Sequence, residues 1–294
     1  MLTETEVSAA RLPALRSVSS DGTVKVSFLT TEGVSFESCL LNLDYRDIPR
    51  VVCLSTQLGC PFDCAFCAIS QISFQRNLTT AELLQQISCA LDDVSWDGKT
   101  EPFEVAAMGT GEPMCALPEI IEAVRSAKLF ASNLCSLNVA TVGIPERIRY
   151  YARTRIEGVR FNLQLSLHAS SDEQRSAIMP QAARIAMRSI LEACSEFANL
   201  QNTRVLINYL LLRGVNDSPG DAVRLAQLLT PRLYAIKVSI LNPTPGSTLE
   251  GATPAATREF CSMLRREGFQ TRIFTSAGTD IGAGCGQFSN SLTD

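Results

Sequence analysis

Eleven cysteines and a single histidine stand out among the residues of this 294-residue chain that could do chemistry. Three of the cysteines, Cys60, Cys64 and Cys67, follow a CxxxCxxC spacing on one short segment. Three thiolates from one loop suit a corner of an iron–sulfur cubane and leave one iron without a protein ligand. Two alternatives stay open from the residues alone. The cysteines could be buried small residues, or they could hold zinc with His168 or a distant cysteine as fourth ligand.

The histidine count excludes several classes of active site. With His168 as the only imidazole, the chain cannot build a histidine-rich metal centre, a two-histidine zinc helix or several independent acid/base histidines. An odd number of thiols in a chain of this length favours metal ligation or thiol catalysis over a disulfide scaffold.

Composition is that of an ordinary globular protein, with 46% hydrophobic and 19% charged residues. No apolar run approaches the ~20 residues that span a bilayer, so no membrane partner is expected. The first twenty residues carry early acids and no apolar block of a secretory signal, which predicts a cytoplasmic protein. The formal charge of −4 means that any nucleic-acid partner must be bound by a local basic patch.

Hydrophobic periodicity predicts strands and helices in alternation. Residues 23–30 and 33–43 alternate like two strands of a hairpin. Helices are expected after the capping residues Thr79, Ser218 and Thr253, and over the apolar stripe of residues 187–197. The further expected strands are 51–55, 103–108, 136–141, 159–166, 204–212, 234–241 and 271–275.

Six successive strand-then-helix units predict an α/β fold around a parallel sheet. Periodicity alone does not separate an open doubly wound sheet from a partial or full barrel. In either case functional groups are expected where strands end and helices begin. We expect a short leader and β-hairpin extension over residues 1–48 and one core domain over 49–294, whose C-terminal segment carries Cys285.

The cysteine segment CLSTQLGCPFDCAFC, with an aromatic residue before its last cysteine, resembles the radical S-adenosylmethionine (SAM) superfamily. From about Asp21 to Phe288, further blocks appear in the order seen in the RlmN/Cfr family of RNA adenine methyltransferases. These blocks are QRNLTTAEL, GTGEP, SLHAS, MPQ, GVNDSP, NPTPGS and GTDIGAGCGQ. The resemblance implies a partial (β/α)6 barrel, a [4Fe-4S] cluster, and SAM bound to the open iron and cleaved to a 5′-deoxyadenosyl radical.

The resemblance also assigns roles to individual residues. It implies that Cys60, Cys64 and Cys67 bind the cluster. It makes Cys285 the cysteine that is methylated, Cys53 its partner thiol, and Glu37 a proton acceptor. The implied SAM-binding residues are Gly111, Glu112, Thr141, Ser166, Leu167, His168 and Asn242.

The chemistry gives a reason for two extra thiols. An electron-poor sp² ring carbon is a poor nucleophile, whereas a thiolate is a good one. In the family scheme Cys285 takes a methyl group from one SAM, and the radical from a second SAM removes a hydrogen from that methyl. The carbon radical adds to the ring, and Cys53 releases the product by forming a disulfide with Cys285. The scheme needs two SAM equivalents per turnover and a flavodoxin- or ferredoxin-type electron donor.

Several departures from the family pattern leave the substrate open. Family members usually carry an N-terminal accessory helical domain, whereas about twenty residues precede the Asp21 block here. Ala277 and Ala140 stand where arginine and serine are usual, and Asn208 replaces a usual glutamate. Loss of basic residues weakens phosphate recognition.

The expected activity is therefore methylation of an adenine-like ring, with RNA adenosine as the first substrate. The alternatives are a small heteroaromatic molecule of a biosynthetic pathway, radical initiation without methyl carriage by Cys285, and a non-catalytic iron–sulfur or zinc module.

Overall fold

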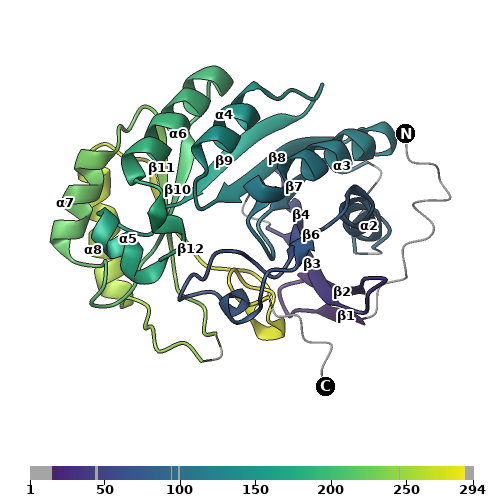
Figure 1. Ribbon diagram of the computed structural model, residues 1–294, viewed down its shortest axis with the longest axis horizontal. Helices are drawn as coiled ribbons and strands as arrows, with labels where there is room; N and C mark the ends of the chain where they lie inside the picture. Colours follow the sequence, from purple (N-terminus) through teal and green to yellow (C-terminus); the bar gives the residue numbers. More distant parts are fainter. Residues whose placement is uncertain (1–14, 44–45, 94, 99, 245, 289–294) are drawn as a thin grey trace.

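The computed structural model describes residues 15–43, 46–93, 95–98, 100–244 and 246–288 (Figure 1). Ten strands form one sheet in the order β1-β2-β3-β4-β7-β8-β9-β10-β11-β12. Within the described residues, the strands of this sheet lie side by side in the order in which they follow one another along the chain, and this order never reverses. A doubly wound sheet needs such a reversal, so the arrangement is the open, partial barrel that the family resemblance implied.

The amino-terminal edge of the sheet is antiparallel. β1 (Leu15–Val18), β2 (Val24–Leu29) and β3 (Ser35–Asn42) form a meander, and β3 pairs antiparallel with the first barrel strand. The expected hairpin is thus confirmed. β1 was not expected, because its four residues are mostly exposed and show no alternation of buried and exposed positions.

The remaining strands of the sheet are parallel and form the barrel wall. They are β4 (Arg50–Leu54), β7 (Phe103–Ala107), β8 (Leu134–Thr141), β9 (Arg160–Ser166), β10 (Val205–Leu210), β11 (Tyr234–Ser239) and β12 (Thr271–Phe274). A small ladder of β5 (Gln57–Leu58) and β6 (Arg76–Asn77) flanks the cysteine loop.

Helices connect the parallel strands and lie along the outer side of the wall, where Figure 1 shows α3, α4, α6 and α7 as the rim of the molecule. The α-helices are α2 (Thr80–Leu91), α3 (Leu117–Phe130), α4 (Pro145–Arg153), α5 (Asp172–Ile178), α6 (Met187–Gln201), α7 (Pro219–Leu228) and α8 (Pro254–Arg266). Short 3-10 turns are η1 (Ala68–Gln71), η2 (Pro113–Ala116), η3 (Ala182–Arg184) and η4 (Thr279–Ile281). In the described ranges, none of the helices has the length and apolar character needed to cross a lipid bilayer.

The expected helix starts are confirmed by their hydrogen bonds. Thr79 and Ser218 each form a capping box with the acid three residues later, and the Thr253 hydroxyl accepts from the Ala256 amide. Each cap satisfies amide donors that the first helical turn leaves without a partner.

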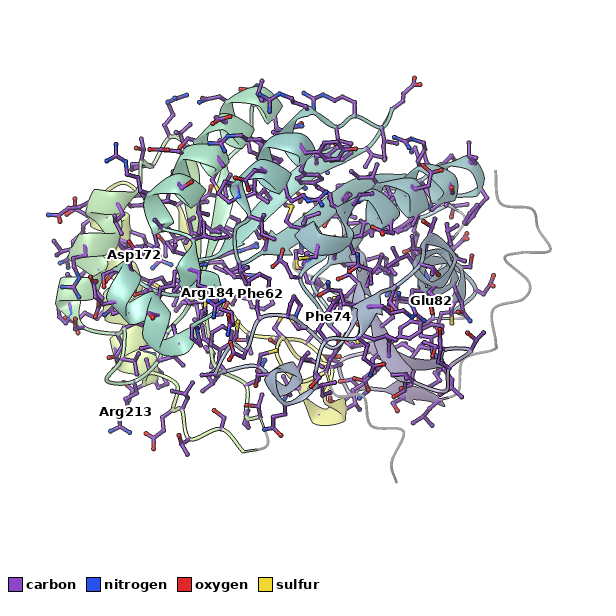
Figure 2. The ribbon with its side chains drawn as sticks, in the orientation of Figure 1. Phe62, Phe74, Glu82, Asp172, Arg184 and Arg213 are labelled. Carbon is purple, nitrogen blue, oxygen red and sulfur yellow. The ribbon has the colours of Figure 1, made fainter. Side chains whose placement is uncertain are left out.

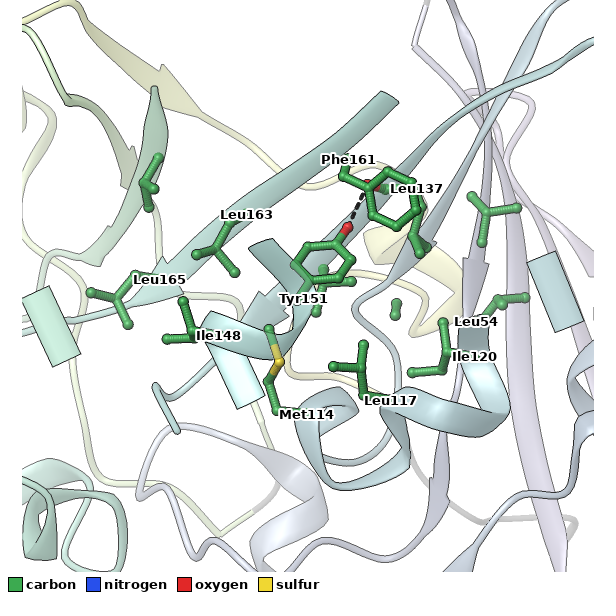
Figure 3. Packing of buried hydrophobic residues seen from close by; sticks show 14 of the residues in the cluster. Leu54, Met114, Leu117, Ile120, Leu137, Ile148, Tyr151, Phe161, Leu163 and Leu165 are labelled. Atoms are coloured by element: carbon green, nitrogen blue, oxygen red, sulfur yellow. Dashed lines mark hydrogen bonds between the residues drawn. The ribbon is translucent and has the colours of Figure 1, made fainter. Parts of the chain in front are cut away.

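The main core lies between the sheet and the helices (Figure 3). In β9, Phe161, Leu163 and Leu165 are buried and alternate with half-exposed Asn162 and Gln164. Because side chains alternate across a strand, the apolar residues face the helices and the polar residues face the barrel interior. This strand therefore presents polar side chains to the barrel interior.

The buried Tyr151 hydroxyl gives a stability prediction. It lies 3.0 Å from the carbonyl oxygen of Leu137, as the dashed line in Figure 3 shows. Tyr151→Phe leaves that buried oxygen without this donor and is expected to lower the free energy of unfolding by about 1 kcal/mol, measured by urea denaturation of the reduced apoprotein. Tyr150→Phe is the matched control, because Tyr150, the preceding residue, is 53% exposed. Equal effects of the two variants would contradict the prediction.

Candidate active site

A cavity opens at the carboxyl ends of the parallel strands, and most of the predicted site residues line it. Those residues are Cys53, Cys60, Cys64, Cys67, Gly111, Glu112, Ser166, His168, Asn242 and Cys285. Three predicted residues, Glu37, Thr141 and Leu167, are buried and are not among the lining residues. Phe62 of the cysteine loop also lines the cavity and lies near the centre of the view in Figure 2.

The cysteine loop is fixed by backbone hydrogen bonds to distant segments. The Ala65 amide donates to the Ile178 carbonyl at 3.0 Å, and the Ala68 amide donates to the Gly286 carbonyl at 2.9 Å. The turn into the loop needs glycine, because Gly59 has φ +72° and a Cβ there would meet the Ser73 carbonyl oxygen. The loop therefore has a defined shape, and the carboxy-terminal segment lies directly beside it.

The three loop thiols offer a donor set for an iron–sulfur cluster. Burial raises the pKa of Cys60 to about 12 and also raises the pKa values of Cys64 and Cys67, so a positive metal centre is needed to make thiolates here. Within the described residues, no three His, Cys, Asp or Glu side chains form a group that could hold one metal ion. In a cubane each thiolate binds a different iron, so its ligands need not converge on one point. Three thiols that line one cavity therefore fit a cubane cluster.

Glu112 presents a buried carboxylate to the cavity at the end of β7. Its oxygens accept from the Thr141 hydroxyl at 2.6 Å, the Val142 amide at 2.9 Å and the Met114 amide at 3.0 Å. Burial raises the pKa of Glu112 to about 6, although these hydrogen bonds act in the opposite direction. Thr141, predicted to contact SAM, lies behind Glu112 and fixes the position of its carboxylate.

Gly111 provides close packing beside that carboxylate. It has φ +104°, and a Cβ would lie 2.6 Å from the Gln57 side chain. The Gln57 amide oxygen in turn accepts from the Glu112 amide at 2.8 Å. A larger residue at Gly111 would therefore displace the group that holds the Glu112 backbone.

His168 is held as a neutral imidazole. Burial is the main cause that lowers its pKa to about 3, and the positive charges of Arg175 and Lys237 add to it. The Nδ1 atom accepts from the Leu210 amide at 2.9 Å, so the ring proton is on Nε2. With φ 55° the residue takes a left-handed backbone conformation that few non-glycine residues adopt. His168 is thus a fixed donor at the cavity wall, and Leu167 beside it belongs to the core.

Asn242 holds the segment that carries Cys285. Its side-chain Nδ2 donates to the Cys285 carbonyl at 2.9 Å and to the Ser276 hydroxyl at 2.8 Å. The Cys285 amide donates to the same hydroxyl at 3.3 Å. The residue predicted to contact SAM therefore also positions the exposed cysteine.

Asn242→Ala is expected to loosen this segment. Loss of a hydrogen bond worth about 1 kcal/mol should raise amide hydrogen exchange at residues 284–286 roughly five- to tenfold, measured by mass spectrometry. Exchange elsewhere should not change. Asn199→Ala on the exposed end of α6 is the matched control, and equal exchange in the two variants would refute the role of Asn242.

The two additional thiols face the same cavity. Cys53 in β4 is 9% exposed, whereas Cys285 is exposed. Burial raises the pKa of Cys53 to about 12, with the neighbouring Cys285 as a further cause. Cys39, Cys53, Ala283 and Phe288 form an apolar cluster that packs the carboxy-terminal segment against β3 and β4. All eleven cysteines are free, so the structure contains no disulfide.

Glu37 does not join this group. Its carboxylate forms an ion pair with Lys25 at 3.0 Å, and only 3% of its side chain is exposed. Glu37 lies on the same face of β3 as Cys39, two residues along the strand. The sequence resemblance placed it with the reacting cysteines, but the structure leaves it outside the cavity.

Among the cavity residues that were not predicted as site residues, two are polar groups on neighbouring strands. Asn208 reaches the cavity from β10 and Lys237 reaches it from β11. The available signal was a polar residue in an apolar strand, above all the lysine between Ile236 and Val238. A charge flanked by two core residues points into the barrel by alternation.

Comparison with known proteins agrees with this geometry. The family described as "Radical SAM superfamily" matches residues 54–226. A "Probable dual-specificity RNA methyltransferase RlmN" of Thermus thermophilus is 37% identical over 277 residues, which cover 92% of this chain and 75% of that protein. The chain belongs to the RlmN family of radical SAM methyltransferases. A protein of the same name from Mycobacterium sp. strain KMS is 36% identical, over 95% of this chain and 78% of its own length.

Solved structures give the same result for the fold. A crystal structure of a radical SAM methyltransferase from Sphaerobacter thermophilus has a TM-score of 0.86 and 30% identity, covering 95% of this chain and 81% of that one. The hydrogenase maturase HydG, at 15% identity and a TM-score of 0.57, shares the fold alone. The expected enzyme class is confirmed, and these likenesses favour it over a non-catalytic iron–sulfur or zinc module. A [4Fe-4S] cluster and SAM are the cofactors of this superfamily.

Proposed function

We propose that this radical SAM methyltransferase methylates an electron-poor carbon of an adenine-like ring through Cys285, with an RNA adenosine as substrate. The observation that carries the proposal is that Cys285 and Cys53 line the same cavity as the three cysteines of the CxxxCxxC loop. The relatives named above as RNA methyltransferases support RNA as the acceptor.

Cys60, Cys64 and Cys67 would hold the cluster. When bound, a [4Fe-4S] cluster with three protein thiolates offers SAM an open iron and supplies the electron that cleaves it to a 5′-deoxyadenosyl radical. Glu112 would accept from the SAM amino group, because it presents a fixed anionic acceptor at the cavity wall. His168 and Ser166 line the wall beside the core residue Leu167, where they would orient the rest of SAM.

Cys285 would act as the methyl carrier, since it is the exposed thiol among the lining cysteines. Two SAM molecules would be used per turnover, one to methylate Cys285 and one to form the radical that activates the methyl. After the ring adduct gives up one electron, Cys53 would attack the Cys285 sulfur, and the bond between that sulfur and the transferred carbon would break as the disulfide forms. A thiol reductant would then restore both cysteines, so the disulfide would exist only during turnover. Glu37 stays the predicted proton acceptor; its carboxylate pairs with Lys25, and it is not among the residues that line the cavity. The electron donor would be a flavodoxin- or ferredoxin-type protein, in the reducing cytoplasm.

A small heteroaromatic acceptor is the second candidate substrate. The formal net charge of −4 favours it, because phosphate contacts dominate the affinity of proteins for RNA and require local cationic groups.

The test is an anaerobic reaction of the reconstituted enzyme with methyl-labelled SAM, in which total RNA and a metabolite extract compete as acceptors. Label in an RNA adenosine is expected, with label on the Cys285 peptide in reactions stopped before the acceptor is added. Label only in a metabolite would overturn the RNA assignment. Label in RNA without label on Cys285 would overturn methyl carriage.

A further inference from the structure

Two polar side chains lie next to each other on adjacent strands inside the barrel. Asn208 of β10 and Lys237 of β11 are register partners in the parallel ladder. Neighbouring strands are about 4.8 Å apart, and partners in register point to the same face of a sheet. Both side chains line the cavity that contains Cys53 and Cys285. They therefore form a pair of polar groups at the wall of the proposed reaction site.

The Asn208 amide lacks a partner where one is needed. Asn208 is only 8% exposed, and no donor contacts its side-chain Oδ1 atom. The backbone carbonyl of Asn208, in contrast, accepts from the amides of Leu167 and His168. A buried acceptor without a donor costs about 1–3 kcal/mol. Asn208 lines the cavity, but this oxygen is less than 1 Å² exposed, so a bound molecule supplies the missing donor when the side-chain amide turns toward the cavity.

Lys237 places a buried cation beside that acceptor. Its side chain is 6% exposed, donates to the Gln164 side-chain oxygen at 3.0 Å, and lies 4.4 Å from the centre of the Phe274 ring. It forms no salt bridge with an acid in the described ranges of the chain. Burial lowers the pKa of Lys237 to about 8. The thiols of Cys285 and Cys53 lie near the ammonium and raise this pKa. An ammonium carries three donors, so donors remain for a ligand.

Other polar groups inside the barrel satisfy one another. Asn162 donates to the Asn138 oxygen at 3.1 Å, and Asn138 donates to the Ser136 hydroxyl at 3.3 Å. The Ser136 hydroxyl donates in turn to Glu104 at 2.8 Å. This network extends over β7, β8 and β9 and needs no ligand at these contacts. The Asn208 oxygen is different, because no donor of the described residues reaches it.

We propose that Asn208 and Lys237 read the amino edge of the target ring. The Asn208 oxygen accepts from an exocyclic amine, and Lys237 donates to the adjacent ring nitrogen. An adenine-type ring presents this donor next to an acceptor. Donation from a cation also withdraws electron density from the neighbouring ring carbons, which suits attack by a carbon radical. The inference rests on the proposed function, and it names the residues that select the ring.

A binding experiment tests this selection without turnover. Full-length reconstituted protein is saturated with S-adenosylhomocysteine to fill the SAM site, and adenosine or purine riboside is titrated by calorimetry. Purine riboside lacks the amine. A site built to accept from an amine rejects an analogue without it, so wild type should prefer adenosine by roughly tenfold or more. Asn208→Ala should lose this preference, and Lys237→Met should weaken both ligands.

The ratio of the two affinities is the decisive measurement, because a purely structural effect of Asn208→Ala would lower both affinities equally. Asn199→Ala, on the exposed surface of α6, should keep the wild-type ratio. An unchanged ratio in Asn208→Ala overturns the proposal. Absence of saturable adenosine binding to S-adenosylhomocysteine-loaded wild type also overturns it, as expected if the pair instead belongs to the SAM site. Labelling of Cys285 by SAM, measured separately by mass, fails only if the proposed function fails.

Discussion

Replacing Cys285 by alanine is expected to abolish methylation of the substrate while the enzyme still cleaves SAM reductively. The methyl carrier must be a nucleophilic thiol, and Cys285 is the exposed thiol in the cavity. The loop cysteines that would hold the cluster are not altered by this substitution. Methylated product should fall by more than about 10³-fold, as when a covalent nucleophile is removed from an enzyme. Chromatography of 5′-deoxyadenosine and of labelled product from the same reaction measures both activities.

The control for this experiment is Cys89→Ala. Cys89 is a half-buried thiol of α2 that does not line the cavity, so both activities should be retained. Substrate methylation by the Cys285→Ala enzyme would show that another group carries the methyl, or that the radical acts without methyl carriage. Loss of SAM cleavage in that variant would instead show that Cys285 supports the cofactor site.

Most of the fold could be predicted because it is encoded locally. The strand β9 alternates apolar and polar residues, and the helix starts at Thr79 and Ser218 follow from capping side chains next to an apolar stripe. Such signals depend on residues within a few positions of each other. The order of the strands depends on residues far apart in the chain. The choice of a partial barrel over a doubly wound sheet therefore depended on the family resemblance.

The candidate site was predictable only in part, for the same reason. The CxxxCxxC spacing is local, and its three thiols do face one cavity. The link from Asn242 to the Cys285 carbonyl joins residues 43 positions apart, and no sequence period reports it. Asn208 and Lys237 meet through the register of two strands separated by a helix. Glu37 shows the same limit, because matching a motif does not report that its carboxylate pairs with Lys25.

Removal of one loop thiol should have the second large effect. Cys64→Ala deletes the central cysteine of the CxxxCxxC loop, whose side chain is 8% exposed and lines the cavity. An iron–sulfur cluster held by three thiolates loses a ligand that water or a neighbouring backbone group replaces poorly. After anaerobic reconstitution, iron content and visible absorption should therefore drop sharply. Reductive SAM cleavage should fall by more than about 10³-fold, comparable to removal of an essential catalytic group.

Cys115→Ala is the matched control for this variant. Cys115 is a half-buried thiol directly after the Glu112 block, but it does not line the cavity. It should therefore keep full iron content and SAM cleavage. Because a small thiol contributes little to packing, unfolding of the Cys64→Ala apoprotein should stay close to wild type, which separates loss of a ligand from loss of the fold. A Cys64→Ala protein that still binds iron and cleaves SAM at the wild-type level would place the metal elsewhere, and the roles assigned to Cys60 and Cys67 would then fail with it.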